Sequence, residues 1–223
     1  MKAWLKQNRG FLIFLLCFGF FRSAVADWNP IPSGSMRPTL LEGDVVLVDR
    51  LAYDLKVPLT DIVLLPLGDP RRVDVVTFSS PVDGVRLIKR LVGLPGDVVE
   101  LRDEVLLING SPAGYENPHD VAEAVDFGAG TVKGVTVTER VAGSERVVQF
   151  LAEVPARRSF GPFVVPSDSY FFLGDNRDNS ADSRYIGAVP RRLLIGRAHH
   201  ILVSADIKGD WLLRLERIGS HIR

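Results

Sequence analysis

The segment GVRLIKRLVGLPGDVVELRDEVLLING, residues 84–110, carries the strongest indication of the fold of this chain. It begins with an apolar run that only basic side chains interrupt, and the Gly-Leu-Pro-Gly-Asp of residues 93–97 closes that run in a turn. Two shorter apolar runs follow within residues 98–108, and Asn109 and Gly110 mark a second turn. The segment therefore predicts a strand, a turn and a β-hairpin.

Short apolar runs of the same kind recur on both sides of this segment. They lie at residues 43–48, 73–78, 163–166 and 170–173. Gly, Pro and Asp residues separate these runs, as is typical of strands joined by tight turns. The pattern predicts an all-β sandwich or barrel-like fold.

Residues 111–158 differ from the rest of the chain. They are richer in Gly, Glu and Ala, and their alternation is weaker, although residues 131–141 and 146–154 still predict strands. A chain of 223 residues suits one domain, or a core with an insertion. We therefore expect a β-rich insertion at residues 111–158 on a β core formed by residues 28–110 and 159–223.

Charge and composition exclude several classes of protein. Lys plus Arg equals Asp plus Glu, which argues against extended nucleic-acid binding. The single cysteine, Cys17, allows no intrachain disulfide. The four histidines show no spacing with Cys or carboxylates that indicates a metal site, so we expect neither a metal nor a cofactor. These are His119, His199, His200 and His221, and we expect His199 and His200 to lie in a strand.

The N-terminus carries the only long apolar run, at residues 11–21, after the basic residues Lys2, Lys6 and Arg9. One interpretation is a cleavable secretory signal, because Ala24, Val25 and Ala26 form an A-x-A pattern. The other is a retained membrane anchor whose helix extends to about Ala26. Both place the rest of the chain outside the cytoplasm, because the N-terminal positive charges stay inside.

Residues 31–40, IPSGSMRPTL, follow directly on this N-terminal region. Ser33 and Ser35 flank Gly34, and Pro32 and Pro38 bracket all three. Such a segment can hold the backbone in an unusual shape around an exposed hydroxyl. On composition alone an ordinary polar turn is the better interpretation.

Residues 174–184, GDNRDNSADSR, form a dense polar stretch between apolar segments. A solvated loop is the simplest interpretation. The charges alternate in sign, however, and can satisfy each other in a network.

Lys89 lies in the predicted strand at residues 86–92. Alternation places it on one face with Leu87 and Leu91. Desolvation on such a face lowers the pKa of an ammonium and yields a neutral amine that can accept a proton from a serine nucleophile. Alone, Lys89 is better explained as an edge-strand lysine that prevents aggregation.

Taken together, these segments resemble the ordered sequence motifs of type I signal peptidases. The matching segments are residues 31–40, 43–48, 89–97 and 174–184. Members of this family are membrane-anchored Ser-Lys endopeptidases that remove signal peptides from exported proteins. The resemblance covers the end of the apolar run, roughly residues 28–103, and residues 159–223, and it is weak across residues 111–158.

The resemblance implies a role for each matching side chain. Ser35 is the nucleophile, and Lys89 is the general base. The Ser35 N–H and the Ser33 hydroxyl form the oxyanion hole. Ser180 hydrogen-bonds the lysine amine and orients it. Met36 is expected to line the rim of the substrate cleft.

The resemblance also implies a brace beneath the site. Asp182 and Arg184 form a structural pair, and Asp175 and Arg177 join the same polar network. A substrate would bind as an extended strand between the segments around Ser33 and Lys89, which is β-augmentation. Alternation suggests Ile31, Leu87 and Val85 as the lining of small side-chain pockets for an Ala-x-Ala site.

For the whole chain, the resemblance implies a mainly antiparallel all-β catalytic core with one N-terminal membrane-anchor helix within residues 1–27. It predicts a single-pass protein of the inner, cytoplasmic membrane, with the catalytic core on the outer, periplasmic or extracellular face. The expected partners are signal peptides of exported precursors and the lipid bilayer, without nucleic acid or metal. It favours a retained anchor over a cleaved signal.

Two alternatives remain beside a general signal peptidase. One is a specialised signal peptidase for a pilus or secretion component. The other is a non-catalytic, membrane-tethered β-domain that binds extended peptides. A Ser-x-x-Lys hydrolase is excluded, because no serine is followed three residues later by lysine. No G-x-S-x-G motif surrounds Ser35 either.

Overall fold

The computed structural model describes residues 4, 7–58, 60, 62–124 and 131–222. Antiparallel strands are its predominant secondary structure, so the prediction of a mainly antiparallel β fold is confirmed. Within the described ranges, the α-helices with assigned bounds are α2 (Arg9–Ala24) and α3 (Ser183–Ile186), with 3-10 turns η1 (Gly34–Met36), η2 (Arg191–Leu193) and η3 (Leu215–Arg217). The strands are β1 (Ala26–Pro30), β2 (Asp44–Asp49), β3 (Asp54–Lys56), β4 (Val63–Pro66), β5 (Val75–Ser79), β6 (Arg86–Gly93), β7 (Val98–Arg102), β8 (Val105–Ile108), β9 (Ser111–Pro112), β10 (Gly114–Ala124), β11 (Thr131–Val141), β12 (Ser144–Phe150), β13 (Phe160–Val164), β14 (Ser169–Leu173), β15 (Val189–Pro190) and β16 (Leu194–Ser204).

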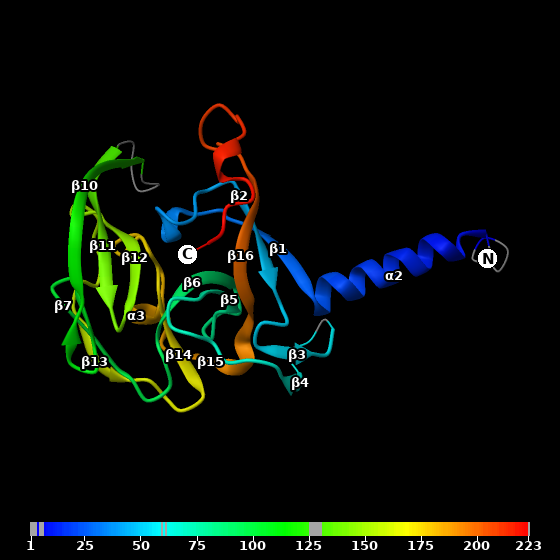
Figure 1. Ribbon diagram of the computed structural model, residues 1–223, viewed down its shortest axis with the longest axis horizontal. Coiled ribbons are helices and arrows are strands. Elements are labelled where there is room, and N and C mark those ends of the chain that lie inside the picture. Colours follow the sequence, from blue (N-terminus) through cyan, green and yellow to red (C-terminus); the bar gives the residue numbers. More distant parts are fainter. Residues whose placement is uncertain (1–3, 5–6, 59, 61, 125–130, 223) are drawn as a thin grey trace.

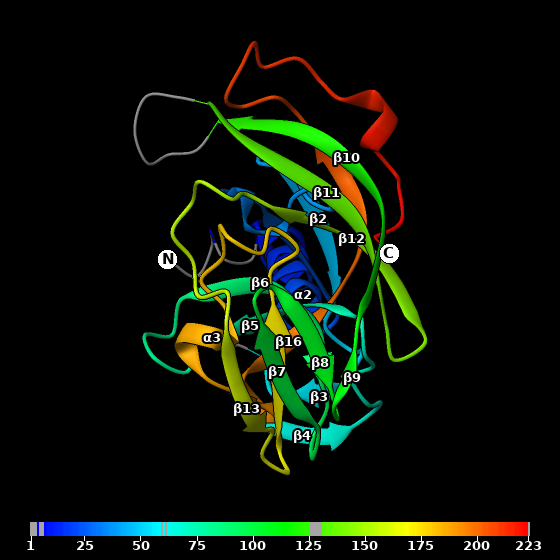
Figure 2. The same ribbon diagram turned by 90° about the vertical axis from the view of Figure 1, so that its left-hand side faces the viewer.

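The described strands form four sheets. A seven-stranded sheet has the order β1-β2-β16-β5-β6-β14-β15, and a four-stranded sheet has the order β13-β7-β8-β9. β10, β11 and β12 form a three-stranded sheet, and β3 pairs with β4. In Figure 1 the three-stranded sheet and α2 lie on opposite sides of β2 and β16. Figure 2 shows the three-stranded sheet above the four-stranded one.

The segment 84–110 forms the predicted strand, turn and hairpin as β6, β7 and β8. The hairpin reverses at Asp103 and Glu104, whose φ angles of 46° and 74° suit a two-residue turn. At the end of β6, a Cβ on Gly93 would lie 2.7 Å from a Val99 methyl and 2.9 Å from Phe171 Cβ. Glycine is therefore required where β6 pairs with Phe171 of β14 and packs against Val99 of β7.

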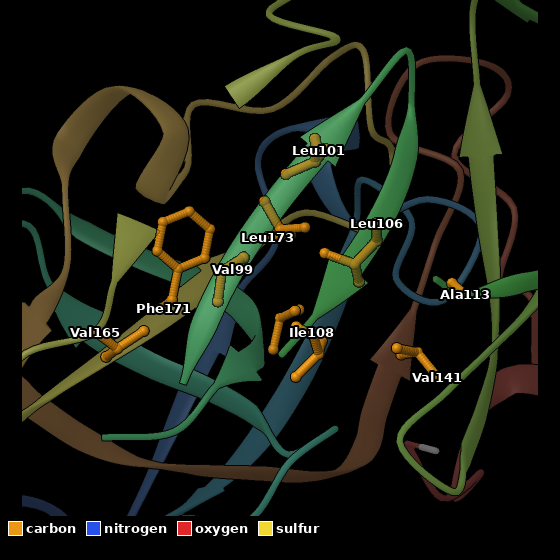
Figure 3. Close-up of a cluster of buried hydrophobic side chains, with 10 residues drawn as sticks. Val99, Leu101, Leu106, Ile108, Ala113, Val141, Val165, Phe171 and Leu173 are labelled. Atoms are coloured by element: carbon orange, nitrogen blue, oxygen red, sulfur yellow. The ribbon is translucent and has the colours of Figure 1, made fainter. Parts of the chain in front are cut away.

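The main apolar core lies between this hairpin and β14 (Figure 3). Val99, Leu101, Leu106 and Ile108 from the hairpin pack against Phe171, which is fully buried. Full burial of each large apolar side chain contributes about 1.5–3 kcal/mol. The hairpin thus joins the four-stranded sheet to the strand that leads into the polar loop 174–184.

Several strands differ from their predicted bounds, and others were not predicted. The run at 146–154 becomes β12 and ends at Phe150, and the run at 163–166 lies partly in β13. β10 was missed because its sequence, GYENPHDVAEA, is largely polar. β10, β11 and β12 lie within residues 111–158, whose status as an insertion stays a prediction.

The N-terminal helix α2 projects away from the β-sheets (Figure 1). It ends at Ala24, so its predicted extension to about Ala26 is wrong: Ala26 already pairs with β2. The reason lies at its end, where Arg22 stacks over Trp28 at 4.2 Å and contacts Asp27 at 3.2 Å. In the described part of the chain, no helix has the length and apolarity needed to cross a membrane.

Candidate active site

Residues 31–40, the serine segment, are held in place by buried apolar side chains on both sides of Ser33 and Ser35. Ile31, Met36 and Leu40 are buried in one cluster with residues of β2. Met36 has no exposed surface, so its predicted place on the rim of the cleft is wrong. Its burial pins η1, which leaves Ser33 exposed and Ser35 at the edge of the interior.

Lys89 lies directly opposite Ser35. Its Nζ donates a hydrogen bond to Ser35 Oγ at 2.5 Å, and the lysine is 3% exposed. Burial lowers the pKa of Lys89 to about 8, although Asp182 and Asp175 partly oppose this shift. The ammonium can therefore lose its proton at mildly alkaline pH and then accept one from the serine.

Successive side chains of β6 around Lys89 point to opposite faces of the sheet, as the sequence predicts. Leu87 and Leu91 belong to one apolar cluster, and Ile88 packs against another. Leu87 and Leu91 lie on the same face of β6 as Lys89 and contribute to its desolvation.

A cleft of about 460 Å³ opens onto these groups. It brings together four of the predicted site residues, Ser33, Ser35, Lys89 and Ser180. Its other walls are Gly34, Leu87, Val154, Pro155, Asp178, Asn179, Ala181 and Tyr185. Of the three predicted pocket residues, only Leu87 lines the cleft. Ile31 is buried in the core instead, and Val85 is exposed elsewhere.

Ser180 lies in this cleft without the hydrogen bond expected of it. Within the described part of the chain, its buried Oγ has no hydrogen-bond partner, so the predicted bond to the Lys89 amine is not formed. Its loop approaches Ser35 closely at Gly174, where a Cβ would lie 2.2 Å from Ser180 Oγ and 2.5 Å from the Ser35 carbonyl oxygen. Only glycine permits this approach.

Asp182 and Arg184 form a buried bidentate ion pair. Arg184 Nε and Nη2 each donate to the Asp182 carboxylate at 2.8 Å. The same carboxylate accepts the Gly174 N–H at 3.0 Å, and Arg184 also donates to the Arg177 carbonyl. The pair therefore closes the polar loop on itself next to Lys89.

Comparison with known proteins identifies the family. The model of the family described as signal peptidase, peptidase S26, matches residues 1–203. This chain belongs to the signal peptidase family. It is similar to the signal peptidase I of Pseudomonas aeruginosa, with 36% identity over 231 residues, 96% of this chain and 78% of that protein. The signal peptidase I of Pseudomonas fluorescens is 35% identical over 96% of this chain and 78% of its own length.

More distant members give the same family. The signal peptidase I of Rickettsia prowazekii is 33% identical over 91% of this chain and 81% of its own length. A crystal structure of a signal peptidase I from Enterococcus faecalis is 31% identical, covers 58% of this chain and 96% of its own, and has a TM-score of 0.34. The family model and the two Pseudomonas relatives confirm the family predicted from the sequence, and with it the prediction of a serine protease that cleaves signal peptides.

In this member of the signal peptidase family, Asp175 and Arg177 have partners that sequence reasoning missed. Asp175 accepts from Arg90 Nε at 2.7 Å and Nη2 at 2.6 Å. Arg177 donates to both oxygens of Glu139, at 2.7 and 2.6 Å. The sequence did indicate a buried partner for Arg90, because a charged side chain in an apolar strand needs one.

Glu139 belongs to β11 and brings the three-stranded sheet into this network. Burial alone would raise the pKa of Glu139, but Arg177 and Arg146 lower it to about 2. Arg146 contacts the same carboxylate at 2.5 Å. The contacts of Glu139 with Arg177 and Arg146 could not be predicted, because the alternation of apolar and polar residues in 111–158 is weak.

Three of the four histidines, which were given no role from sequence, cluster together, and none of the three lines the cleft. His199 and His200 lie in β16 as predicted, and a bulge between Ala198 and His200 breaks the alternation there. His221 joins them, with ring centroids 4.4–5.0 Å apart. Among the described residues, no group of three or more His, Cys, Asp or Glu has the arrangement that a metal ion needs.

Proposed function

We propose that this signal peptidase uses Ser35 as its nucleophile and Lys89 as its general base. The observation that carries the proposal is the buried hydrogen bond from Lys89 Nζ to Ser35 Oγ. A serine hydroxyl needs a base within hydrogen-bond reach, and a desolvated lysine can serve when no histidine is present. With a pKa of about 8, roughly a tenth of the enzyme would hold a neutral lysine at pH 7.

The reaction proceeds in two halves. Lys89 takes the proton from Ser35 Oγ while the oxygen bonds to the scissile carbonyl carbon. The lysine then gives that proton to the leaving amine as the C–N bond breaks, which leaves an acyl-enzyme. In the second half, Lys89 takes a proton from water, the water oxygen attacks the ester, and Ser35 recovers its proton as the carboxylate product leaves.

Two groups on the serine segment stabilise the charge that forms on the carbonyl oxygen. They are the Ser35 N–H and the exposed Ser33 hydroxyl, which flank Gly34. Removal of one such donor typically lowers the rate about 10²–10³-fold. Ser180 lines the cleft beside Lys89, and the Asp182–Arg184 pair supports the loop that carries Ser180.

The substrate binds as an extended strand between the serine segment and β6. Leu87, Val154 and Tyr185 narrow the cleft beside the nucleophile. Small substrate side chains of the Ala-x-Ala type fit such walls, and larger ones are excluded by steric clash. The catalytic core comprises residues 28–110 and 159–223, and residues 111–158 form an insertion.

We further propose that α2 anchors the enzyme in the cytoplasmic membrane, with the core on the outer face. Phe11, Leu16 and Phe21 of α2 are more than half exposed. Two regions of the core, one around β4 and one leading into η3, also expose large apolar side chains, which suits contact with lipid. They are Ile62, Leu64 and Leu65 in one region, and Trp211, Leu212, Leu213 and Leu215 in the other. N-terminal sequencing of the membrane-bound protein tests the anchor, because a start at Asp27 would show that the helix is removed.

The proposed roles of Ser35 and Lys89 are tested with Ser35→Ala and Lys89→Ala in a cleavage assay on an Ala-x-Ala precursor. Both variants should fold, as judged by circular dichroism, and both should lose cleavage. The wild-type rate should rise with pH as Lys89 loses its proton. Near wild-type turnover by Lys89→Ala, or a flat profile between about pH 6 and 9, would exclude Lys89 as the base.

A further inference from the structure

Asn176 is a buried residue of the polar loop to which the proposed mechanism gives no part. It has no exposed surface. Its Nδ2 donates to the Gly34 carbonyl oxygen at 3.1 Å, and its backbone N–H donates to the Ser35 carbonyl oxygen at 3.2 Å. One residue therefore holds the peptide units on both sides of the nucleophile.

The first of these peptide units joins the Gly34 carbonyl to the Ser35 N–H, the backbone donor of the proposed oxyanion hole. A hydrogen bond to the carbonyl fixes the plane of the unit. It also polarises the N–H at the other end, because linked hydrogen bonds strengthen one another. A donor must lie about 2.7–3.1 Å from the developing oxyanion to be effective. Asn176 can thus control both the direction and the strength of this donor.

Glu123 of β10 determines which end of the Asn176 amide faces Gly34. Both Glu123 carboxylate oxygens lie 3.2 Å from Asn176 Nδ2, and the glutamate is 3% exposed. A carboxylate and a carbonyl are both acceptors, so the amide nitrogen alone can satisfy them together. Among the described residues, Asn176 Oδ1 has no partner, so the amide is held only by its nitrogen.

Gln149 in β12 makes a second set of hydrogen bonds that hold Asn176 in place. Its side-chain amide donates to the Glu123 carboxylate. Its backbone N–H donates to the Asp175 carbonyl, and its carbonyl accepts the Arg177 N–H, each at 2.8 Å. The three-stranded sheet therefore fixes Asn176 through both its side chain and its backbone.

We propose that Asn176 is a positioning residue for cleavage, which through the Gly34 carbonyl aims and polarises the Ser35 N–H toward the oxyanion. This rests on the proposed function, since the bond matters to the rate only if that N–H stabilises the transition state. The effect falls on the transition state and not on substrate binding. Loss of the bond therefore lowers kcat and leaves KM nearly unchanged.

The test uses Asn176→Ala and Asn176→Asp in the full chain, with a synthetic peptide that contains an Ala-x-Ala site. We expect kcat to fall about tenfold or more, up to the loss that follows removal of an oxyanion donor. KM should stay within about twofold, and the pH midpoint set by Lys89 should not move. Wild-type kcat, or a loss explained by a shifted pH midpoint, would overturn the proposal.

A matched control is Ser183→Ala. Ser183 is fully buried near the end of the same loop, and its Oγ accepts the Phe172 N–H at 2.9 Å. This variant should lower Tm but keep kcat. If its kcat fell as far as that of Asn176→Ala, the effect of Asn176 would be a general consequence of losing a buried hydrogen bond.

The double variant Asn176→Asp with Glu123→Gln separates stability from chemistry. The donor and acceptor at positions 123 and 176 are exchanged, so their contact is restored, but the Gly34 carbonyl still lacks a donor. Tm should recover while kcat stays low; recovery of kcat would refute the proposal. Activity in Ser35→Ala would instead defeat the proposed function, whereas inactive Ser35→Ala beside fully active Asn176 variants would defeat only this inference.

Discussion

Lys89 and Arg90 are neighbouring cations on one strand, both buried, with opposite electrostatic environments. Arg90 is 1% exposed and forms a bidentate pair with Asp175, which also accepts the Thr39 hydroxyl at 2.6 Å. Lys89 is 3% exposed, and its Nζ donates to a neutral serine hydroxyl. In the described part of the chain, no carboxylate lies within 4 Å of that amine.

This difference fits a structural role for Arg90 and the proposed catalytic role of Lys89. A guanidinium keeps its proton at any ordinary pH, so burial requires a partner that neutralises it. An ammonium can instead lose its proton, and burial without a partner favours that loss. The same strand thus holds one cation that must stay charged and one that must be able to become neutral.

The largest expected effect on activity comes from Lys89→Arg, which replaces the cation that can lose its proton with one that cannot. The arginine stays protonated and cannot accept the Ser35 proton, so kcat should fall about 10⁴-fold or more. The measurement is single-substrate cleavage kinetics on the purified enzyme. Lys89→Met should lose as much activity and still fold, which separates the chemical loss from any damage by the larger side chain.

Arg90→Lys is the reciprocal change. It keeps the charge and loses the bidentate geometry, so stability should fall by about 1–2 kcal/mol while kcat changes less than about tenfold. Equal losses of activity in Lys89→Arg and Arg90→Lys would mean that the two cations do not have separate roles.

The next effect concerns the ion pair between Arg90 and Asp175 and is measured as a change in the free energy of unfolding. Asp175→Ala leaves the Arg90 guanidinium buried without its carboxylate, which should lower the free energy of unfolding by about 3–5 kcal/mol. Urea denaturation in micelles measures this. Glu116→Ala is the control, because it removes an exposed pair with Arg140 at 2.8 Å and should change stability little. Similar losses in both variants would show that burial does not set the strength of the Arg90 pair.

The sequence allowed the strand pattern and the set of residues near the cleft to be predicted, because both depend on local order. Apolar runs and turn signals located β2, β5, β6 and the β7–β8 hairpin. The resemblance located Ser35 and Lys89, which the structure brings into contact.

Contacts between distant segments could not be predicted. Arg90 meets Asp175 across 85 positions, and Arg177 meets Glu139 across 38, and no periodicity links such residues. The expected hydrogen bond of Ser180 failed for a related reason. Its direction depends on how the loop folds back over Gly174, which no short motif encodes.

The last effect is a pH dependence of stability to which Lys89 contributes and Arg90 does not. Lys89 has a pKa of about 8 in the folded state, against an ordinary value of 10.5. Between these values the unfolded chain binds the proton and the folded chain does not, so stability rises with pH. Below about pH 8 both states are protonated, and wild-type enzyme carries the full penalty of a buried ammonium, about 3 kcal/mol. Above about pH 10.5 the penalty disappears.

Lys89→Met lacks this titration, while the other groups contribute equally to both proteins. The difference in unfolding free energy between wild type and Lys89→Met should therefore shift by about 3 kcal/mol in favour of wild type from pH 8 to 10.5. Denaturation curves of both proteins across that range provide the measurement. A difference that did not change with pH would mean that the folded protein stabilises the ammonium as well as water does. Lys89 would then be a second Arg90, a buried charge held for structure, and the general base would have to be sought elsewhere.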